Sequence, residues 1–257
     1  MCKWKRLMKL RNCRATAAVL FLVFLATATA FSGNENPGIA PPNSSAHGAS
    51  YGVWGAAWWQ WVFSLPARAP DGLPNPLFTD GAVDCSLGQS GNVWFLAGRI
   101  CFTCNGVVTT AHRSCKIPTG TALFFPMLNG EADNVATNPP STLDQLIAVA
   151  AQNAAATELH ASIDGVKLKD LFSYRGSSAP FRYTVPTPDN IYTFLGFHVP
   201  GSDWPTTTVF PAASDGYFLM VEPLPPGAHT INFGGTAQSG FQIDITYDIT
   251  VVPKGQF

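Results

Sequence analysis

The sequence lacks the clustered cationic side chains that nucleic-acid-binding proteins use. Of its 15 Lys and Arg residues, six lie in the first 14 positions, and the other nine are scattered along the chain. All 16 Asp and Glu residues lie after residue 30, so residues 31–257 carry a formal net charge of −7. Because phosphate backbones are bound by basic patches, we expect no nucleic-acid partner.

A membrane-spanning segment is also missing. The run from Ala15 to Ala30 is uncharged and mostly apolar, but it is short of the about 20 residues that cross a bilayer comfortably, and no later run approaches that length. It follows a basic start and ends in Ala28-Thr29-Ala30, a small-x-small sequence typical of signal-peptidase cleavage. We therefore expect residues 1–30 to be a signal peptide cleaved near Ala30. The mature protein should be secreted or periplasmic and not membrane-embedded.

Several catalytic motifs are absent as well. No Gly-x-Ser-x-Gly nucleophile elbow occurs, and Gly88-Gln-Ser-Gly91 resembles one only superficially. No histidine would become the first residue after cleavage at Ala30, so the copper site of oxidative polysaccharide enzymes is not available. We see no internal repeat.

Four cysteines follow the signal peptide, namely Cys85, Cys101, Cys104 and Cys115. An even number in an exported chain favours two disulfides, and three pairings are open. The alternative is a zinc site in which Cys101 and Cys104 are joined by His112, Cys115 or Cys85. A single Cys-x-x-Cys is weak evidence for a metal, so we expect disulfides, no metal and no cofactor.

The most aromatic stretch is Tyr51–Leu65, with four tryptophans in eight residues. Apolar residues recur there every three or four positions, which predicts a helix buried on most sides and ended by Pro66. Such aromatic stripes usually belong to the core. The alternative is that one tryptophan, Trp59, lines a cleft that binds a sugar or another polymer.

The rest of the chain predicts a mainly β protein. Residues 31–50 are rich in Gly, Pro, Asn and Ser and should form a flexible leader. One alanine-rich helix is expected over Ser141–Leu159, capped by Ser141 with Asp144. Strands are expected at residues 93–97, 122–126, 181–185, 191–199, 217–222 and 228–233. Strict alternation from Phe241 to Val251 predicts an antiparallel strand with one buried face. Residues 51–257 should form a single α+β domain, an antiparallel β-sandwich or jelly-roll-like fold with both helices packed on it.

Several of these stretches together resemble a family of uncharacterised secreted bacterial proteins. The shared motifs are Trp-x3-Trp-Trp-Gln-Trp from Trp54, Gly-Gln-Ser-Gly-x-Val-Trp-Phe-Leu-Ala-Gly from Gly88, Arg-x-Cys-x-x-Pro-x-Gly from Arg113, and Leu-Pro-Pro-Gly-x-His-Thr-Ile-x-Phe from Leu224. The resemblance covers nearly all of the mature chain. It implies that Cys85 pairs with Cys115, which leaves Cys101 with Cys104, and it implies no activity.

Acidic residues supply the candidates for catalysis. Glu131 and Asp133 are expected in a polar loop, Asn129–Asp133, at the end of a strand, where functional residues often lie. Because we expect their side chains to diverge, a hydrolase would need a partner such as Asp215. His198 is a further candidate, in a Gly/Pro loop with Trp204. The alternatives are that the carboxylates are solvated charges or calcium ligands, and that the histidine is structural.

Binding without turnover is the other class of function. Planar aromatic side chains pack on sugar rings, and amides bind sugar hydroxyls. The residues that supply these parts are Trp59, Gln60, Asn92, Trp94, Asn129 and Trp204. We therefore expect a secreted protein that interacts with an extracellular polysaccharide or other polymer. A glycosidase-like hydrolase and a structural envelope or matrix protein remain as alternatives.

Overall fold

The computed structural model describes residues 35–68, 72–100, 107–135, 137, 139–186, 189–197 and 208–256. Residues Asn34–Phe257 form one compact unit. The expected signal peptide, Cys101, Cys104, His198 and Trp204 lie outside the described residues. Within the described part of the chain, no helix is long and apolar enough to cross a membrane.

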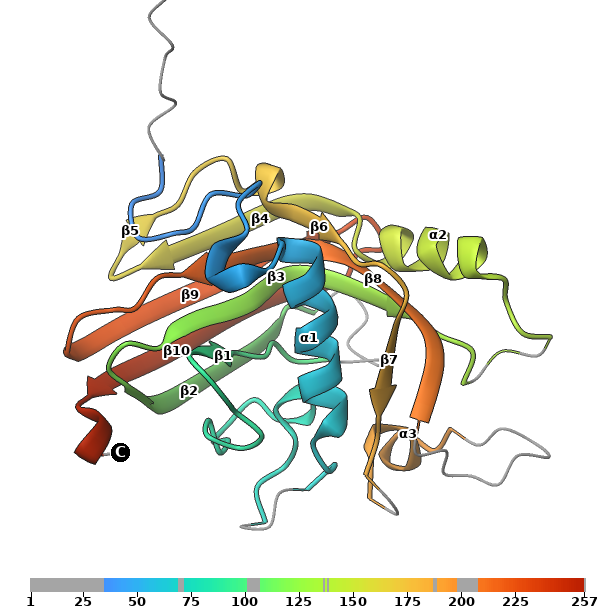
Figure 1. Ribbon diagram of the computed structural model, residues 1–257, viewed down its shortest axis with the longest axis horizontal. Coiled ribbons are helices and arrows are strands. Elements are labelled where there is room, and N and C mark those ends of the chain that lie inside the picture. Colours follow the sequence, from blue (N-terminus) through green and yellow to red (C-terminus); the bar gives the residue numbers. More distant parts are fainter. Residues whose placement is uncertain are drawn as a thin grey trace, which may run out of the picture. The chain divides into compact units, whose positions relative to one another are not determined.

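The protein is mainly β, as predicted, and is built around two five-stranded sheets (Figure 1). The first sheet contains, in spatial order, β1 (Val93–Phe95), β3 (Ala122–Ala132), β8 (Thr208–Val221) and β6 (Arg175–Ser177), with β7 (Phe181–Thr184) also paired to β8. The second contains β2 (Thr109–Pro118), β10 (Gln242–Val252), β9 (Gly227–Ala237), β4 (Ala156–Ile163) and β5 (Val166–Lys167). The β1–β3 and β2–β10 pairs are parallel and the others antiparallel, so both sheets are mixed.

Strand β3 is buried on both of its faces, which explains its long apolar run. Phe124 points to one face, where its ring lies 6.0 Å from that of Tyr51 in the helix α1 (Tyr51–Ser64). The next residue, Phe125, points to the other face and stacks on Phe233 of β9, with ring centroids 4.4 Å apart. Successive side chains of a strand point in opposite directions, so β3 joins the helical layer to the second sheet.

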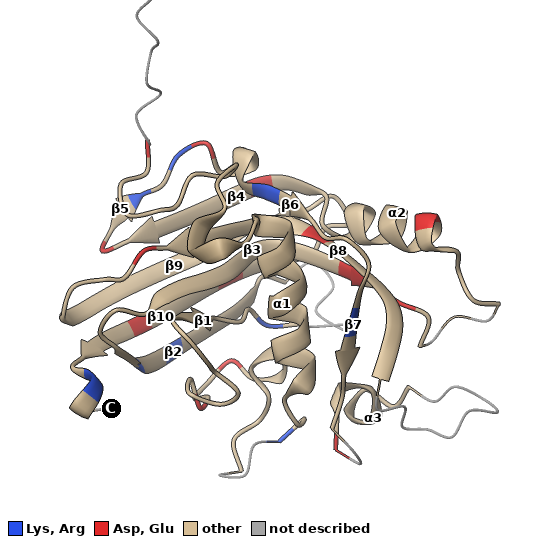
Figure 2. Ribbon diagram, viewed as in Figure 1, with Lys and Arg blue, Asp and Glu red and all other residues tan. Residues whose placement is uncertain are grey.

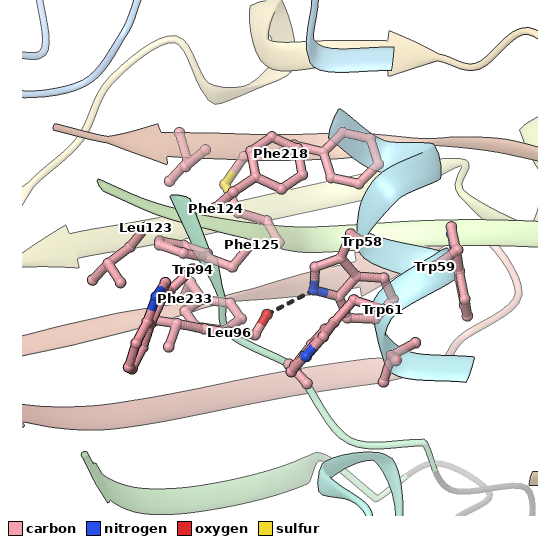
Figure 3. Packing of buried hydrophobic residues seen from close by; sticks show 14 of the residues in the cluster. Trp58, Trp59, Trp61, Trp94, Leu96, Leu123, Phe124, Phe125, Phe218 and Phe233 are labelled. Atoms are coloured by element: carbon pink, nitrogen blue, oxygen red, sulfur yellow. Dashed lines mark hydrogen bonds between the residues drawn. The ribbon is translucent and has the colours of Figure 1, made fainter. Parts of the chain in front are cut away.

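The predicted tryptophan helix is present as α1 (Tyr51–Ser64), and most of its aromatic side chains are core. Ser50 caps the helix by accepting a hydrogen bond from the Val53 amide. Trp58 is fully buried, and its indole N–H donates to the Leu96 carbonyl over 2.9 Å (Figure 3). Trp61 donates in the same way to the Leu87 carbonyl.

The expectation of a flexible leader is wrong for residues 35–50. Asn36 is buried and donates from its side-chain amide to the Lys169 carbonyl and the Tyr174 hydroxyl. Ile39 is also buried and forms an isolated β-bridge with Val221 of β8. The few apolar and amide groups of this segment therefore have specific partners, which its overall composition did not reveal.

The alanine-rich helix is shorter than predicted, and its cap is one residue later. Helix α2 spans Leu143–Asn153, and β4 begins at Ala156, so the helix does not reach Leu159. Thr142 forms the capping box with Gln145, in which each side chain bonds the other residue's backbone N–H. Both pairs, Ser141 with Asp144 and Thr142 with Gln145, have the spacing of a capping box, and the extended backbone at Thr142 selects the second.

One expected strand is instead a helix. Residues 191–194 form the short helix α3 (Ile191–Phe194) because the Asn190 side chain accepts hydrogen bonds from the amides of Tyr192 and Thr193. Single turns of 3-10 helix occur at η1 (Ala46–Gly48), η2 (Pro76–Phe78), η3 (Leu171–Tyr174) and η4 (Lys254–Gln256). A tight turn at Asp164-Gly165 joins β4 to β5, and both residues have positive φ angles.

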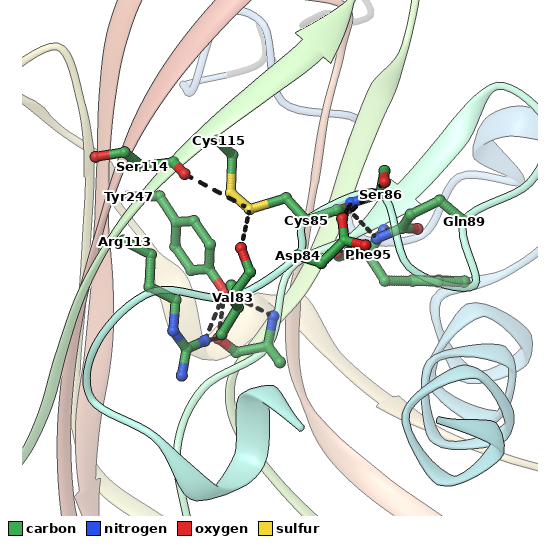
Figure 4. The surroundings of a disulfide bond; sticks show 11 residues. Val83, Asp84, Cys85, Ser86, Gln89, Phe95, Arg113, Ser114, Cys115 and Tyr247 are labelled. Atoms are coloured by element: carbon green, nitrogen blue, oxygen red, sulfur yellow. Dashed lines mark hydrogen bonds between the residues drawn. A yellow bond between two sulfur atoms is a disulfide. The ribbon is translucent and has the colours of Figure 1, made fainter. Parts of the chain in front are cut away.

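A disulfide and a buried arginine attach the loops before β1 and β2 to the second sheet (Figure 4). Cys85 is joined to Cys115 of β2, with their Cα atoms 5.7 Å apart. The neighbouring Arg113 is 1% exposed, and its guanidinium donates to the Tyr247 hydroxyl and to backbone carbonyls of Pro76, Thr79, Ala97 and Gly98. This cationic side chain therefore fixes the two loops that carry residues 76–79 and 97–98.

Candidate functional site

A pocket of about 470 Å³ lies against β3, with walls from α1, α3 and the segment after β1. Most of its lining is aromatic or aliphatic, and β3 runs along it from Pro126 to Asp133. The apolar and aromatic side chains that line it include Trp58, Trp59, Phe63, Leu77, Ile100, Met127, Leu128, Ile191, Tyr192, Leu195, Phe197, Phe241 and Ile243. Polar groups enter this apolar surface at a few points, as is usual for a ligand pocket.

Glu131 and Asp133 both line the pocket, and their carboxyl groups are hydrogen-bonded to each other. The expectation that these side chains diverge was wrong. Strand β3 continues to Ala132, so the expected polar loop is extended strand, and residues two apart in a strand point to the same face. A carboxyl pair therefore arises from β3 and its end without help from another element.

The surroundings of the two carboxyl groups differ. Asp133 accepts hydrogen bonds from the Val135 amide (2.7 Å), the Tyr192 hydroxyl (2.6 Å) and the Tyr183 hydroxyl. Burial and the nearby negative charge of Asp133 raise the pKa of Glu131 well above its usual range. Burial and the same carboxylates also raise the pKa values of Tyr183 and Tyr192, which therefore remain donors. Glu131 therefore keeps its proton at a pH where an exposed glutamate has lost it.

Four buried polar atoms without a hydrogen-bond partner belong to residues that line this pocket. They are Trp59 Nε1, Arg99 Nε, Asn129 Nδ2 and Glu131 Oε1. Three are donors, and Glu131 Oε1 is an acceptor because this carboxyl shares its proton with Asp133. Leaving one such group unsatisfied costs about 1–3 kcal/mol, so a cluster of four calls for an explanation.

Four of the predicted site residues therefore line the same pocket, namely Trp59, Asn129, Glu131 and Asp133. Gln60 does not line it. Trp59 lies beside Trp58, with ring centroids 4.9 Å apart, and faces the pocket. The side-chain amide of Gln60 donates instead to the Arg182 carbonyl of β7, over 2.8 Å. Gln60 thus joins α1 to the first sheet.

Three other predicted site residues lie elsewhere. Trp94 is buried in the core, and Asn92 borders a separate hollow with His47 and Trp54. Asp215 is paired with Gly130 across β3 and β8, so its side chain points to the face opposite Glu131. There it forms an ion pair with Arg175 and accepts a hydrogen bond from the Ser177 hydroxyl.

The sequence did not reveal Arg99, Tyr183 or Tyr192 as parts of the site. Tyr183 and Tyr192 are 50 and 59 residues from Asp133 along the chain, and only the pairing of β7 with β8 brings the first of them close. No local pattern marks such a pair. In the described residues, no group of three His, Cys, Asp or Glu side chains is placed to hold a metal ion.

No protein-family model, curated protein or solved structure matches the chain. The chemistry of the pocket is therefore the guide to its function.

Proposed function

We propose that the protein is a secreted saccharide-binding protein and that this pocket holds one sugar unit. The observation that carries the proposal is the group of unpartnered polar atoms on Trp59, Arg99, Asn129 and Glu131. Sugar hydroxyls both donate and accept hydrogen bonds, so a ring with several hydroxyls can satisfy donors and an acceptor at once. The aromatic walls then cover the apolar faces of the ring.

The shape of the site favours a single unit or a chain end over a long stretch of polymer. Its volume of about 470 Å³ lies within the range of small-ligand pockets. Trp61 and Trp94 are buried in the core and do not line the pocket, and the indole N–H of Trp58 is bonded to the Leu96 carbonyl, so these tryptophans do not extend the site into an aromatic platform. Recognition would then depend on the hydroxyl pattern of one residue of the ligand.

Hydrolysis by a pair of carboxylates has weaker support. Glycosidases place their two carboxyl groups roughly 5–10 Å apart, on either side of the scissile bond. Glu131 and Asp133 are in hydrogen-bond contact, and Asp133 also accepts from Tyr183, Tyr192 and Val135. In this arrangement Asp133 orients Glu131 and keeps it protonated, which suits binding better than turnover.

Matched tryptophan variants test the proposal. Purified protein would be screened against soluble saccharides by ligand-observed NMR, and the best ligand titrated by calorimetry. Trp59→Phe keeps an aromatic ring but removes the unpartnered N–H, so we expect weaker binding with little loss of stability. Trp61→Phe removes an N–H that bonds the Leu87 carbonyl, so we expect lower stability and unchanged affinity. Equal effects of both changes on affinity, or binding to no saccharide, would contradict the proposal.

A further inference from the structure

We infer that the pocket selects acidic sugars, with the carboxylate of a uronic acid bound by Arg99. The inference rests on the proposed saccharide-binding function and adds the class of sugar. Among the described residues that line the pocket, Arg99 is the one Lys or Arg, and its Nε is a buried donor without a partner. Figure 2 shows the cationic residues as separate short segments along the described chain. Arg113 lies close by, but its guanidinium is committed to backbone carbonyls, including those of Ala97 and Gly98, and to the Tyr247 hydroxyl.

The guanidinium of Arg99 is only weakly held by the protein. Its Nη1 lies 3.7 Å from Asp80, whose side chain is 70% exposed, and 3.4 Å from the Thr110 carbonyl. Such a long ion pair with a solvated carboxylate contributes little and is screened by water. Arginine binds carboxylates through two parallel hydrogen bonds, which the planar fork of its nitrogens allows. A ligand carboxylate would therefore find both charge and donors at this position.

The acidic side chains of the pocket, Glu131 and Asp133, lie toward its other end. Gly98, next to Arg99, packs against the side chain of Ile243, and Gly235 opposite Ile243 lies against Leu128. Asp133 comes five residues after Leu128 on an extended segment, which corresponds to roughly 16 Å along the strand. The Glu131 carboxyl adds no second charge, because it shares its proton with Asp133. An acidic sugar can thus place its carboxylate near Arg99 and its hydroxyls near Asn129 and Glu131.

The balance of donors and acceptors agrees with this orientation. The unpartnered atoms of the pocket are three donors, on Trp59, Arg99 and Asn129, and one acceptor, on Glu131. A uronate has a carboxylate in place of the CH2OH group of a neutral hexose, which removes one hydroxyl donor and adds one acceptor oxygen. A uronic acid therefore suits a cluster in which donors outnumber acceptors.

The test compares sugars that share a ring and differ in one substituent. Glucuronate, glucose, glucosamine and the methyl ester of glucuronic acid would be titrated into the full protein at low salt by calorimetry and ligand-observed NMR. We expect glucuronate to bind at least tenfold more tightly than glucose, because one charge-assisted bidentate contact is gained. The methyl ester keeps the shape but not the charge, so it should bind like glucose.

Two variants locate the effect. Arg99→Gln should remove the preference for glucuronate over glucose. The control is Arg182→Gln, which should leave the preference intact, because Arg182 is an exposed residue of β7 that lies over the Phe210 ring. The ester comparison needs no variant, so the inference can be judged even if Arg99→Gln fails to fold. Equal binding of glucuronate and glucose, or tightest binding of glucosamine, would overturn the inference and leave the saccharide proposal standing. Binding of none of the four would overturn both.

Discussion

Replacing Glu131 by glutamine should make the folded protein more stable at neutral pH than the wild type. The ordinary pKa of this carboxyl is 4.5, and burial together with the charge of Asp133 raises it well above that in the folded state. Above pH 4.5 the unfolded chain therefore loses a proton that the folded protein keeps, so folding must take up a proton. Stability must then fall as the pH rises from 4.5 toward the raised pKa.

The size of the effect follows from linkage. Each pH unit between the ordinary and the raised pKa of Glu131 costs about 1.4 kcal/mol of unfolding free energy. Glutamine does not titrate, yet its amide can donate to Asp133 and its carbonyl can replace Oε1. The difference in stability between Glu131→Gln and the wild type should therefore grow by about 1.4 kcal/mol from pH 5 to pH 6.

Urea unfolding at pH 5, 6 and 7, with the disulfide intact, measures this difference directly. Glu158→Gln is the matched control, because Glu158 is an exposed residue of β4 and the substitution is the same. A stability difference between Glu131→Gln and the wild type that stays constant with pH would show that Glu131 is ionised in the folded protein. The assignment of Glu131 as the pocket's neutral acceptor would then be refuted.

Three further predictions concern the scaffold. Arg113→Met should lower the free energy of unfolding, measured with urea, by about 3–5 kcal/mol, because several loop carbonyls lose their buried donor. A decrease below about 1 kcal/mol would contradict this prediction. Replacing Cys85 and Cys115 by serine should cost roughly 3–4 kcal/mol, as expected for a separation of 30 residues, and the reduced wild type should match that variant. Gly130→Ala should lower the melting temperature, because the new Cβ would lie 2.5 Å from the Ala150 carbonyl oxygen of α2; an unchanged melting temperature would show that α2 shifts freely.

The parts of the fold that the sequence predicted are those set by local pattern. The alternation of Phe241 to Val251 corresponds to β10, and the aromatic periodicity after Ser50 corresponds to α1. The boundaries of α2 and α3 depend instead on which polar side chain caps the helix. Several residues near each helix start have side chains that could form such a cap, so the sequence does not specify which one does. The parallel pairing of β2 with β10 joins distant segments and has no local signal.

The candidate site was likewise predictable only where a local pattern marks it. The sequence singled out four of its residues because each differs from its neighbours in polarity or size, namely Trp59, Asn129, Glu131 and Asp133. Their expected geometry was wrong, because β3 extends farther than its apolar run and places Glu131 and Asp133 on one face. The donors on Tyr183 and Tyr192 are supplied by tertiary structure, which a single sequence does not show.

The position of β10 has a consequence for how the chain folds. This strand lies between β2 and β9, and its ten paired positions with β2 connect residues 109–118 with residues 243–252. Closing so long a loop costs entropy before any contact is gained, and topologies dominated by such distant pairs fold slowly. During synthesis β2 must wait for the last strand, and until then its unpaired edge is open to association with other chains. A chaperone that keeps the chain unfolded until synthesis is complete would therefore raise the yield of native protein.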